Sequence, residues 1–389
     1  ETKILLAEAG SWTSLYKNTG RASNQIYELF NIGSANFVGN LPSVTQAIAG
    51  HSYWTHGTNQ ELENVRTIVR NSAESLSLKT YQTEWSLLGD PPDGSTGFPA
   101  SYDMASTMDI ALFMAKVIQS DLIFANVSSW SFWTAMDVER WGHKNRFFLI
   151  RVTPADGASG SILNSGTAED TPTLWALGNF SRFIRPGYRR IQLEGADDMN
   201  ALFGSAYISP DTGRIVAVFV NTSYSDIKLS SAFKNLDHRI TAVRSYVTSA
   251  GSKLERDPAL AESYTGEIIS LQARSVSTIV YDLDKGSTAI HDYTGNHPGI
   301  SIYPNTASLD SEIRIVSSVL KPYGGTYFRP SEQLEVDLLS VDGRLVKHFR
   351  IQQEQGNYSL RLPAEISNGI YILSLKDHVQ SYCFKILIH

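Results

Sequence analysis

The sequence is poor in cysteine, in long apolar runs and in excess positive charge. Cys383 is the only cysteine among 389 residues, so an intrachain disulfide is excluded. No run of 18 or more apolar residues occurs, so no transmembrane helix is expected. Lys and Arg number 33 against 39 Asp and Glu, a net charge of -6. That balance argues against a nucleic-acid partner, which needs basic patches, and leaves a neutral ligand such as a sugar open.

The sequence also lacks the usual motifs for metal and nucleotide binding. Its nine histidines include no H-x-x-x-H pair, and no cysteine lies near them as a further ligand. The glycines around residues 157–160 are not followed by the Lys and Ser or Thr of a phosphate loop. We therefore predict neither a metal nor a cofactor.

Residues 1–190 alternate strand-like and helix-like segments, which predicts a parallel sheet. The expected strands are 4–7, 51–55, 78–83 and 127–133; the expected helices are 23–30, 41–49, 59–76, 103–120 and 174–184. About four βα units fit in this length, whereas a complete eight-fold barrel needs ~250 residues. We therefore expect a partial (β/α)8 TIM barrel of about strands five to eight. Because Glu1 leads at once into an apolar strand, we expect the domain to begin upstream.

The remainder of the sequence predicts β structure. Short strands separated by Gly, Asp and Asn turns favour a β-sandwich over residues 191–285, with a hairpin turn at 210–213. Residues 286–299 are polar and read as a linker. Residues 300–389 predict a small C-terminal β-sandwich, with a hairpin signal at 342–343. The expected fold class is thus α/β plus all-β.

All seven tryptophans lie within the first 175 residues. Four of them, Trp54, Trp85, Trp130 and Trp133, fall near the ends of expected strands. In a parallel α/β barrel, function sits at the carboxyl ends of the strands, and an aromatic face packs well on the C–H face of a sugar ring. Each tryptophan is as readily a core residue, but the cluster as a whole favours a role in ligand binding.

A glutamate, Glu84, ends the expected strand before Trp85. A carboxylate at the end of a buried strand is costly unless a partner or a function compensates. Retaining glycosidases use a pair of carboxyl groups ~5–5.5 Å apart, one of which attacks the anomeric carbon. The alternative is a solvated carboxylate favoured by the dipole of the following helix. From the residue alone the two interpretations are equal.

Several motifs resemble glycoside hydrolase family 30. The segments 49–54 (AGHSYW), 82–86 (QTEWS) and 129–134 (SWSFWT) look like that family's sixth, seventh and eighth strands. Residues 175–187 are similar to its closing helix, which leads into a side β-sandwich. The resemblance covers about residues 1–285, and its motifs follow in the order and spacing of the family. That family includes glucocerebrosidase, xylanases, and bacterial β-1,6-glucanases and β-1,6-galactanases.

The resemblance implies a role for each matching residue. Glu84 would be the nucleophile, and Tyr53 would hydrogen-bond it. Trp133 would lie beside the reactive sugar, with Trp130 on the same strand. Sugar hydroxyls have two candidate ligands, His51 and His143, each of which is at least as readily a structural histidine.

The sequence departs from the family at the acid/base. The Asn-Glu-Pro motif that supplies this group in the family is absent, so we expect it to lie upstream of Glu1. Glu8 is the other carboxylate expected at a strand end. It matches a fifth-strand position that belongs to the site wall or to the structure, and a role as the acid is the lesser alternative. Without a proton donor, the rate falls by ~10²–10⁴.

The C-terminal motifs resemble the type IX secretion sorting domain of Bacteroidetes. They are residues 302–305, 341–346, 368–373 and 384–388, the last a basic residue within an apolar strand. The resemblance implies contact with the secretion machinery and a place outside the cell or on the outer-membrane surface. The alternative is an ordinary small β-sandwich that binds carbohydrate.

Two functions follow. The first is a secreted retaining glycosidase that acts on a β-linked oligosaccharide or polysaccharide (galactan, glucan or xylan), here without its acid/base. The second is a non-catalytic carbohydrate-binding or inactive remnant that carries a sorting address.

Overall fold

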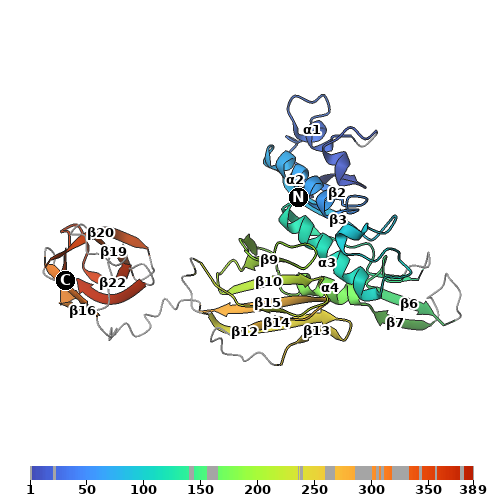
Figure 1. The fold of residues 1–389 in the computed structure, drawn as a ribbon. Helices are drawn as coiled ribbons and strands as arrows, with labels where there is room; N and C mark the ends of the chain where they lie inside the picture. The colour runs from blue at the N-terminus through green and yellow to red at the C-terminus, as the bar shows by residue number, and fades with distance from the viewer. Residues whose placement is uncertain are drawn as a thin grey trace. The chain divides into compact units, whose positions relative to one another are not determined.

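The computed structural model divides the chain into two compact units, residues 1–285 and 286–389. It describes residues 2–20, 23–139, 144–155, 165–234, 236, 240–258, 268–284, 300–303, 306–307, 311–317, 333–340, 344–354, 357–376 and 381–388. Figure 1 shows the helices α1 to α4 in the first unit and the strands that surround β19, β20 and β22 in the second. No described helix is long and apolar enough to span a membrane.

A four-stranded parallel sheet organises the first part of the chain. Its strands follow the sequence in the order β1 (Ile4–Ala9), β2 (Val44–His51), β3 (Lys79–Glu84) and β4 (Val127–Trp130). The connections hold α1 (Gln25–Phe30), α2 (Asn59–Glu74) and α3 (Thr107–Ile123). The mixed α/β class predicted from the sequence is confirmed. Since the strands are parallel, their carboxyl ends meet at one edge of the sheet.

One predicted helix, at residues 41–49, is wrong, because the chain there forms the strand β2. Val44, Ala47, Ile48 and Ala49 are all buried, and a strand covered on both faces reads as a continuous apolar run without period-2 alternation. Short runs of this kind do not distinguish a strand from a helix. The strand predicted at 51–55 is wrong as well, since β2 ends at His51 and Trp54 has a positive φ of 55°.

Polar caps define where the two long helices begin. The Thr58 hydroxyl accepts a hydrogen bond from the Glu61 amide before α2, and Ser106 and Asp109 form a capping box before α3. Most of α3 is buried around its whole circumference. It packs in one hydrophobic cluster with Val216, Val218 and other valines of the following sheet. The helix therefore joins the parallel sheet to the β-rich part of the unit.

A six-stranded antiparallel sheet completes the first unit, in the order β13-β12-β15-β10-β9-β8. One face packs on α3 and on α4 (Pro172–Ser181), and the other on a ribbon of β11 (Ile227–Leu229) and β14 (Ile269–Leu271). The strands are β8 (Arg189–Ile191), β9 (Leu202–Ile208), β10 (Arg214–Asn221), β12 (Ile240–Ser249), β13 (Ser252–Arg256) and β15 (Ser275–Leu283). A small sheet of β5 (Met136–Val138), β6 (Ile150–Pro154) and β7 (Gly166–Asp170) lies beside α4 in Figure 1. The domain boundary at residue 190 stays a prediction.

The second unit is an eight-stranded sheet in the order β16-β18-β21-β20-β19-β22-β23-β17. Buried residues from most of these strands form one hydrophobic cluster. The predicted linker 286–299 and the hairpin turn at 342–343 lie outside the described residues. The strands are β16 (Ile300–Tyr303), β17 (Thr306–Ala307), β18 (Glu312–Ser317), β19 (Gln333–Ser340), β20 (Leu345–Glu354), β21 (Asn357–Arg361), β22 (Gly369–Lys376) and β23 (Ser381–Ile388).

A buried ion pair connects the two long helices of the first unit. Arg66 of α2 donates from Nε to Oδ1 of Asp121 of α3 over 2.6 Å, and both side chains are fully buried. The other Asp121 oxygen, Oδ2, accepts from the Ser52 hydroxyl at 3.2 Å and from the Trp130 indole at 2.8 Å. Burial raises the pKa of Asp121, while Arg66 and the hydrogen bonds lower it. This Asp121 cluster (Ser52, Arg66, Asp121 and Trp130) joins two helices to the ends of β2 and β4.

We predict that Asp121→Ala lowers the free energy of unfolding by about 3–5 kcal/mol, because it leaves the Arg66 guanidinium buried without a counter-charge. Urea denaturation followed by tryptophan fluorescence measures this in the first unit, which holds all seven tryptophans. Lys234→Ala is the control: it breaks a pair with Glu194 whose lysine is 79% exposed, so the change is below about 0.5 kcal/mol. A similar small loss in both variants would contradict the prediction.

Candidate active site

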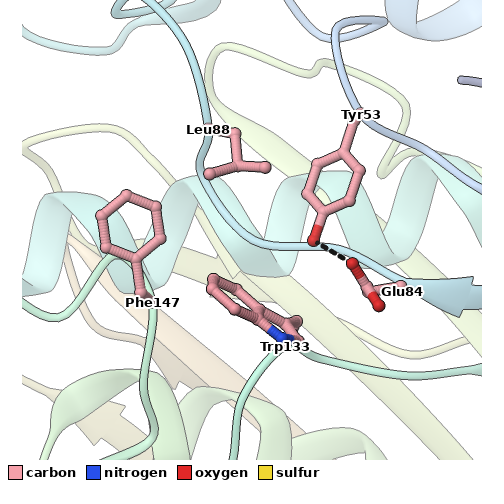
Figure 2. Close-up of a pocket in the computed structure, with 5 residues that line it drawn as sticks. All are labelled: Tyr53, Glu84, Leu88, Trp133 and Phe147. Carbon is pink, nitrogen blue, oxygen red and sulfur yellow. Dashed lines mark hydrogen bonds between the residues drawn. The ribbon is translucent and has the colours of Figure 1, made fainter. Parts of the chain in front are cut away.

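Glu84 is the last residue of β3, and in the parallel ladder it pairs with His51, the last residue of β2. It lines a pocket of about 370 Å³ together with Tyr53, Leu88, Trp133 and Phe147. Figure 2 shows the Tyr53 hydroxyl pointing at the Glu84 carboxylate, with the Trp133 indole beside it. The structure thus brings together three residues that the sequence singled out: Tyr53, Glu84 and Trp133.

The two carboxylate oxygens of Glu84 have different surroundings. Oε1 accepts a hydrogen bond from the Tyr53 hydroxyl at 2.9 Å and lies 3.7 Å from Nδ1 of His51. Oε2 makes no hydrogen bond to the described residues. Burial, followed by the neighbouring carboxylate, raises the pKa of Tyr53, so the phenol keeps its proton and remains a donor. One oxygen is therefore held, and the other is open to a ligand.

His51 connects Glu84 to a second carboxylate, Glu8 of β1. Its Nε2 lies 3.1 Å from Oε2 of Glu8, and the same oxygen accepts from the Thr83 hydroxyl at 2.6 Å. Glu8 has a positive φ of 69° where β1 deviates from regular pairing. Three adjacent strands thus place Glu8, His51 and Glu84 in a row. Two carboxylates and a histidine also occur at metal sites, but no group of three such residues with metal-binding geometry occurs among the described residues.

The predicted tryptophans occupy three different environments. Trp85 has no exposed surface and lies in the core, so its prediction as a wall of the sugar site is wrong. Successive side chains of an extended chain point to opposite sides. Because Glu84 faces the pocket, Trp85 points into the hydrophobic core. Trp130 is partly buried and donates to Asp121 behind the sheet. Trp54 is 60% exposed and Trp133 lines the pocket. The predicted ligand His143 lies outside the described residues.

The sequence did not identify two apolar pocket residues, Leu88 and Phe147. Both lie outside the expected strands and helices, so periodicity gives no signal for them. They are positioned by Arg146, which donates to the carbonyls of Leu87 at 2.8 Å and Gly89 at 3.1 Å. The backbone of Phe147 also accepts a hydrogen bond from the Thr134 amide, next to Trp133. Loop-to-loop hydrogen bonds therefore shape this side of the pocket.

Comparison with known proteins agrees with this geometry. Residues 1–144 match the family model described as O-glycosyl hydrolase family 30. The predicted resemblance to family 30 is confirmed for this part of the chain. Residues 301–389 match the secretion system C-terminal sorting domain. The predicted sorting domain is therefore confirmed too, and it indicates a secreted or outer-surface location.

Solved structures match at low identity. A conserved exported protein from Bacteroides fragilis is 24% identical, with a TM-score of 0.61 over 72% of this chain and 55% of that one. A family 30 endoxylanase from Clostridium papyrosolvens is 19% identical, with a TM-score of 0.46 over 72% of this chain and 56% of that one. The chain thus spans about half the length of these structures. The first likeness shows that the two share a fold.

A buried histidine, His56, lies against Trp85, the residue that follows Glu84. Its Nδ1 accepts a hydrogen bond from the Trp85 indole at 3.3 Å, and its ring also contacts Phe113. Burial lowers the pKa of His56 to about 4, with a further contribution from the Arg66 charge. The native protein therefore holds this histidine neutral, whereas an unfolded chain protonates it near pH 6.5.

This shift predicts a pH-dependent stability. The pKa of His56 is lower in the folded than in the unfolded state. The stability that depends on the neutral imidazole is therefore fully present above about pH 6.5 and is lost as the pH falls toward 4. Between pH 7 and pH 5 the loss is about 2 kcal/mol. In His56→Gln, the free energy of unfolding should fall by that much less over the same interval, as measured by urea titrations at both pH values. His348→Gln, in the other unit, is the control and should keep the native difference; equal pH dependence in His56→Gln and the native protein would refute the assignment.

Proposed function

We propose that the first unit belongs to a secreted glycosidase that acts on a β-linked polysaccharide with retention of configuration. The observation that supports this most is the state of Glu84, whose Oε1 is held by Tyr53 while Oε2 stands open in a pocket walled by Trp133 and Phe147. Glu84 is 36% exposed in its side chain, so solvent and substrate reach it. The match to family 30 supports the same reaction class.

In the proposed reaction, Oε2 of Glu84 attacks the anomeric carbon of a sugar bound against Trp133. A C–O ester bond forms as the glycosidic C–O bond breaks, and the leaving oxygen takes a proton from an acid. Water then attacks the same carbon, releases the sugar and restores the carboxylate. Tyr53 orients Glu84 throughout by its hydrogen bond to Oε1.

The reaction needs a second carboxyl group as acid and base. Among the described residues that line the pocket, Glu84 is the one carboxylate. We propose that the four parallel strands are strands five to eight of a (β/α)8 barrel, and that a strand beyond the edge of β1 supplies the missing group. Glu8, on β1, already forms hydrogen bonds with His51 and Thr83. We therefore assign Glu8 and His51 to the polar wall of the site.

A second candidate, carbohydrate binding without hydrolysis, is favoured by that single carboxylate. The aromatic walls of the pocket serve a bound sugar in either case. The two candidates differ in one measurable respect, because a binding protein gives no turnover whether or not Glu84 is intact.

For the hydrolase, we predict that Glu84→Gln lowers kcat on 4-nitrophenyl β-glycosides and β-linked polysaccharides at least 10³-fold, because the neutral amide cannot form the ester. Tyr53→Phe should lower it about 10–100-fold, the value of one hydrogen bond to a charged group. The assays use the complete protein that carries this sequence. Glu63→Gln, an exposed glutamate on α2, is the matched control and should keep full activity. Turnover retained in Glu84→Gln would exclude its role as nucleophile.

We propose further that the C-terminal unit binds the secretion machinery and depends on β23 for its fold. This strand pairs with β22 along its whole length and buries Phe384, Ile386 and Ile388. Deleting residues 381–389 should therefore unfold the unit and abolish export, seen as loss of the protein from the culture medium and cell surface with retention in the cell. Deletion of 286–299 is the control and should leave the eight strands paired. Normal export without β23 would contradict the proposal.

A further inference from the structure

Trp54, next to the pocket residue Tyr53, is exposed although its backbone and ring are constrained. Among the described tryptophans it is the most exposed, with 60% of its surface accessible. A single exposed apolar side chain is ordinary on a protein surface and needs no explanation. Trp54 differs because three neighbouring groups hold it in place.

Two glycines flank opposite edges of the Trp54 indole. A Cβ added to Gly89 would lie 3.4 Å from Cδ1 and 3.5 Å from Nε1 on the pyrrole edge, and one added to Gly10 would lie 3.6 Å from Cζ3 on the benzene edge. The Tyr53 ring packs at 5.6 Å between centroids, tilted by 45°. The ring is thus supported by the β1 and β3 loops and by its neighbour, while much of its surface stays open.

The backbone around this ring is also specialised. Trp54 has a φ of 55°, a left-handed conformation that bulky residues rarely adopt. Gly89 has a φ of 86°, where a side chain would be strained, and its carbonyl accepts hydrogen bonds from Tyr102 at 3.0 Å and Arg146 at 3.1 Å. Unfavourable conformations persist where surrounding structure holds them, and they cluster at ligand sites. The structure therefore presents an aromatic surface at a fixed position beside the catalytic pocket.

We propose that Trp54 is an outer subsite of the same site, a platform on which a second pyranose of a β-linked polysaccharide stacks by its C–H face. The inference rests on the proposed function of Glu84, since Tyr53 joins the platform to that carboxylate by ring contact and hydrogen bond. Trp54 thereby makes the site selective for a chain of sugars over a single one. The amphipathic indole suits a ligand that has both apolar faces and hydroxyl edges.

Binding to polysaccharide tests the platform without requiring turnover. The complete protein is run in native gels that contain β-1,6-galactan, β-1,6-glucan or β-1,4-xylan, and retardation gives the dissociation constant. We expect retardation in one of these gels, weakened about tenfold in Trp54→Ala and largely kept in Trp54→Phe. Tyr224→Ala removes another aromatic residue, 84% exposed, and should bind as the native protein does.

The outcomes separate this inference from the proposed catalytic role. Glu84→Gln should bind polysaccharide and lack turnover, and Trp54→Ala should raise the KM for polysaccharide about tenfold more than the KM for a 4-nitrophenyl β-monoglycoside. Native affinity in Trp54→Ala overturns the platform alone. An equal loss of kcat/KM on the monoglycoside and on the polymer in Trp54→Ala would indicate a structural role and also overturns the platform. The absence of retardation of the native protein in all three gels overturns it as well. Turnover in Glu84→Gln overturns the catalytic role instead.

Discussion

The buried carboxylate of Asp121 is the interaction on which the arrangement of the first unit depends. It accepts hydrogen bonds from Arg66 on α2, from Ser52 just after β2 and from Trp130 at the end of β4. Two of these donors, Ser52 and Trp130, precede a residue of the pocket by only a few positions. The residue after Ser52 is Tyr53, which holds Glu84, and Trp133 follows Trp130. Separating a fully buried charge from its partners costs much free energy. These bonds therefore hold the ends of β2 and β4 against α2 and α3.

Residues that are neighbours in the sequence have different roles at this site, because successive side chains of an extended chain point to opposite sides. Glu84 faces the pocket and Trp85 faces the core, where its indole donates to His56. Gln82, two positions before Glu84 in β3, is fully buried, and its side chain donates to Ser52 and accepts from the Ser131 amide. The same strand end thus supplies both the proposed nucleophile and the hydrogen bonds that hold the neighbouring segments. This explains why so many polar side chains are buried beneath a pocket whose walls are apolar.

The two units of the chain have separate tasks. The first contains residues 1–144, which match the family 30 model, and the candidate active site; the second contains residues 301–389, which match the sorting domain. Their hydrophobic clusters are distinct, each built from residues of one unit. A secretion address with its own core can be attached to an enzyme without altering the packing around the active site. The surface location that the sorting domain indicates is consistent with the proposed polysaccharide substrate, since a polysaccharide is too large to enter a cell.

The sequence by itself determined the elements with strong periodicity and the residues within ordered motifs. It predicted α2, α3 and the strands β1, β3 and β4, and it selected Tyr53, Glu84 and Trp133, which the structure gathers in one pocket. It did not determine β2, because a strand buried on both faces has the apolar pattern of a short helix. Nor did it separate Trp85 from Trp133, since one step along an extended chain reverses the direction of a side chain and composition carries no such information. Tertiary structure alone added Leu88 and Phe147 and linked His51 to Glu8, because these contacts arise only when loops and strands distant in sequence are packed together.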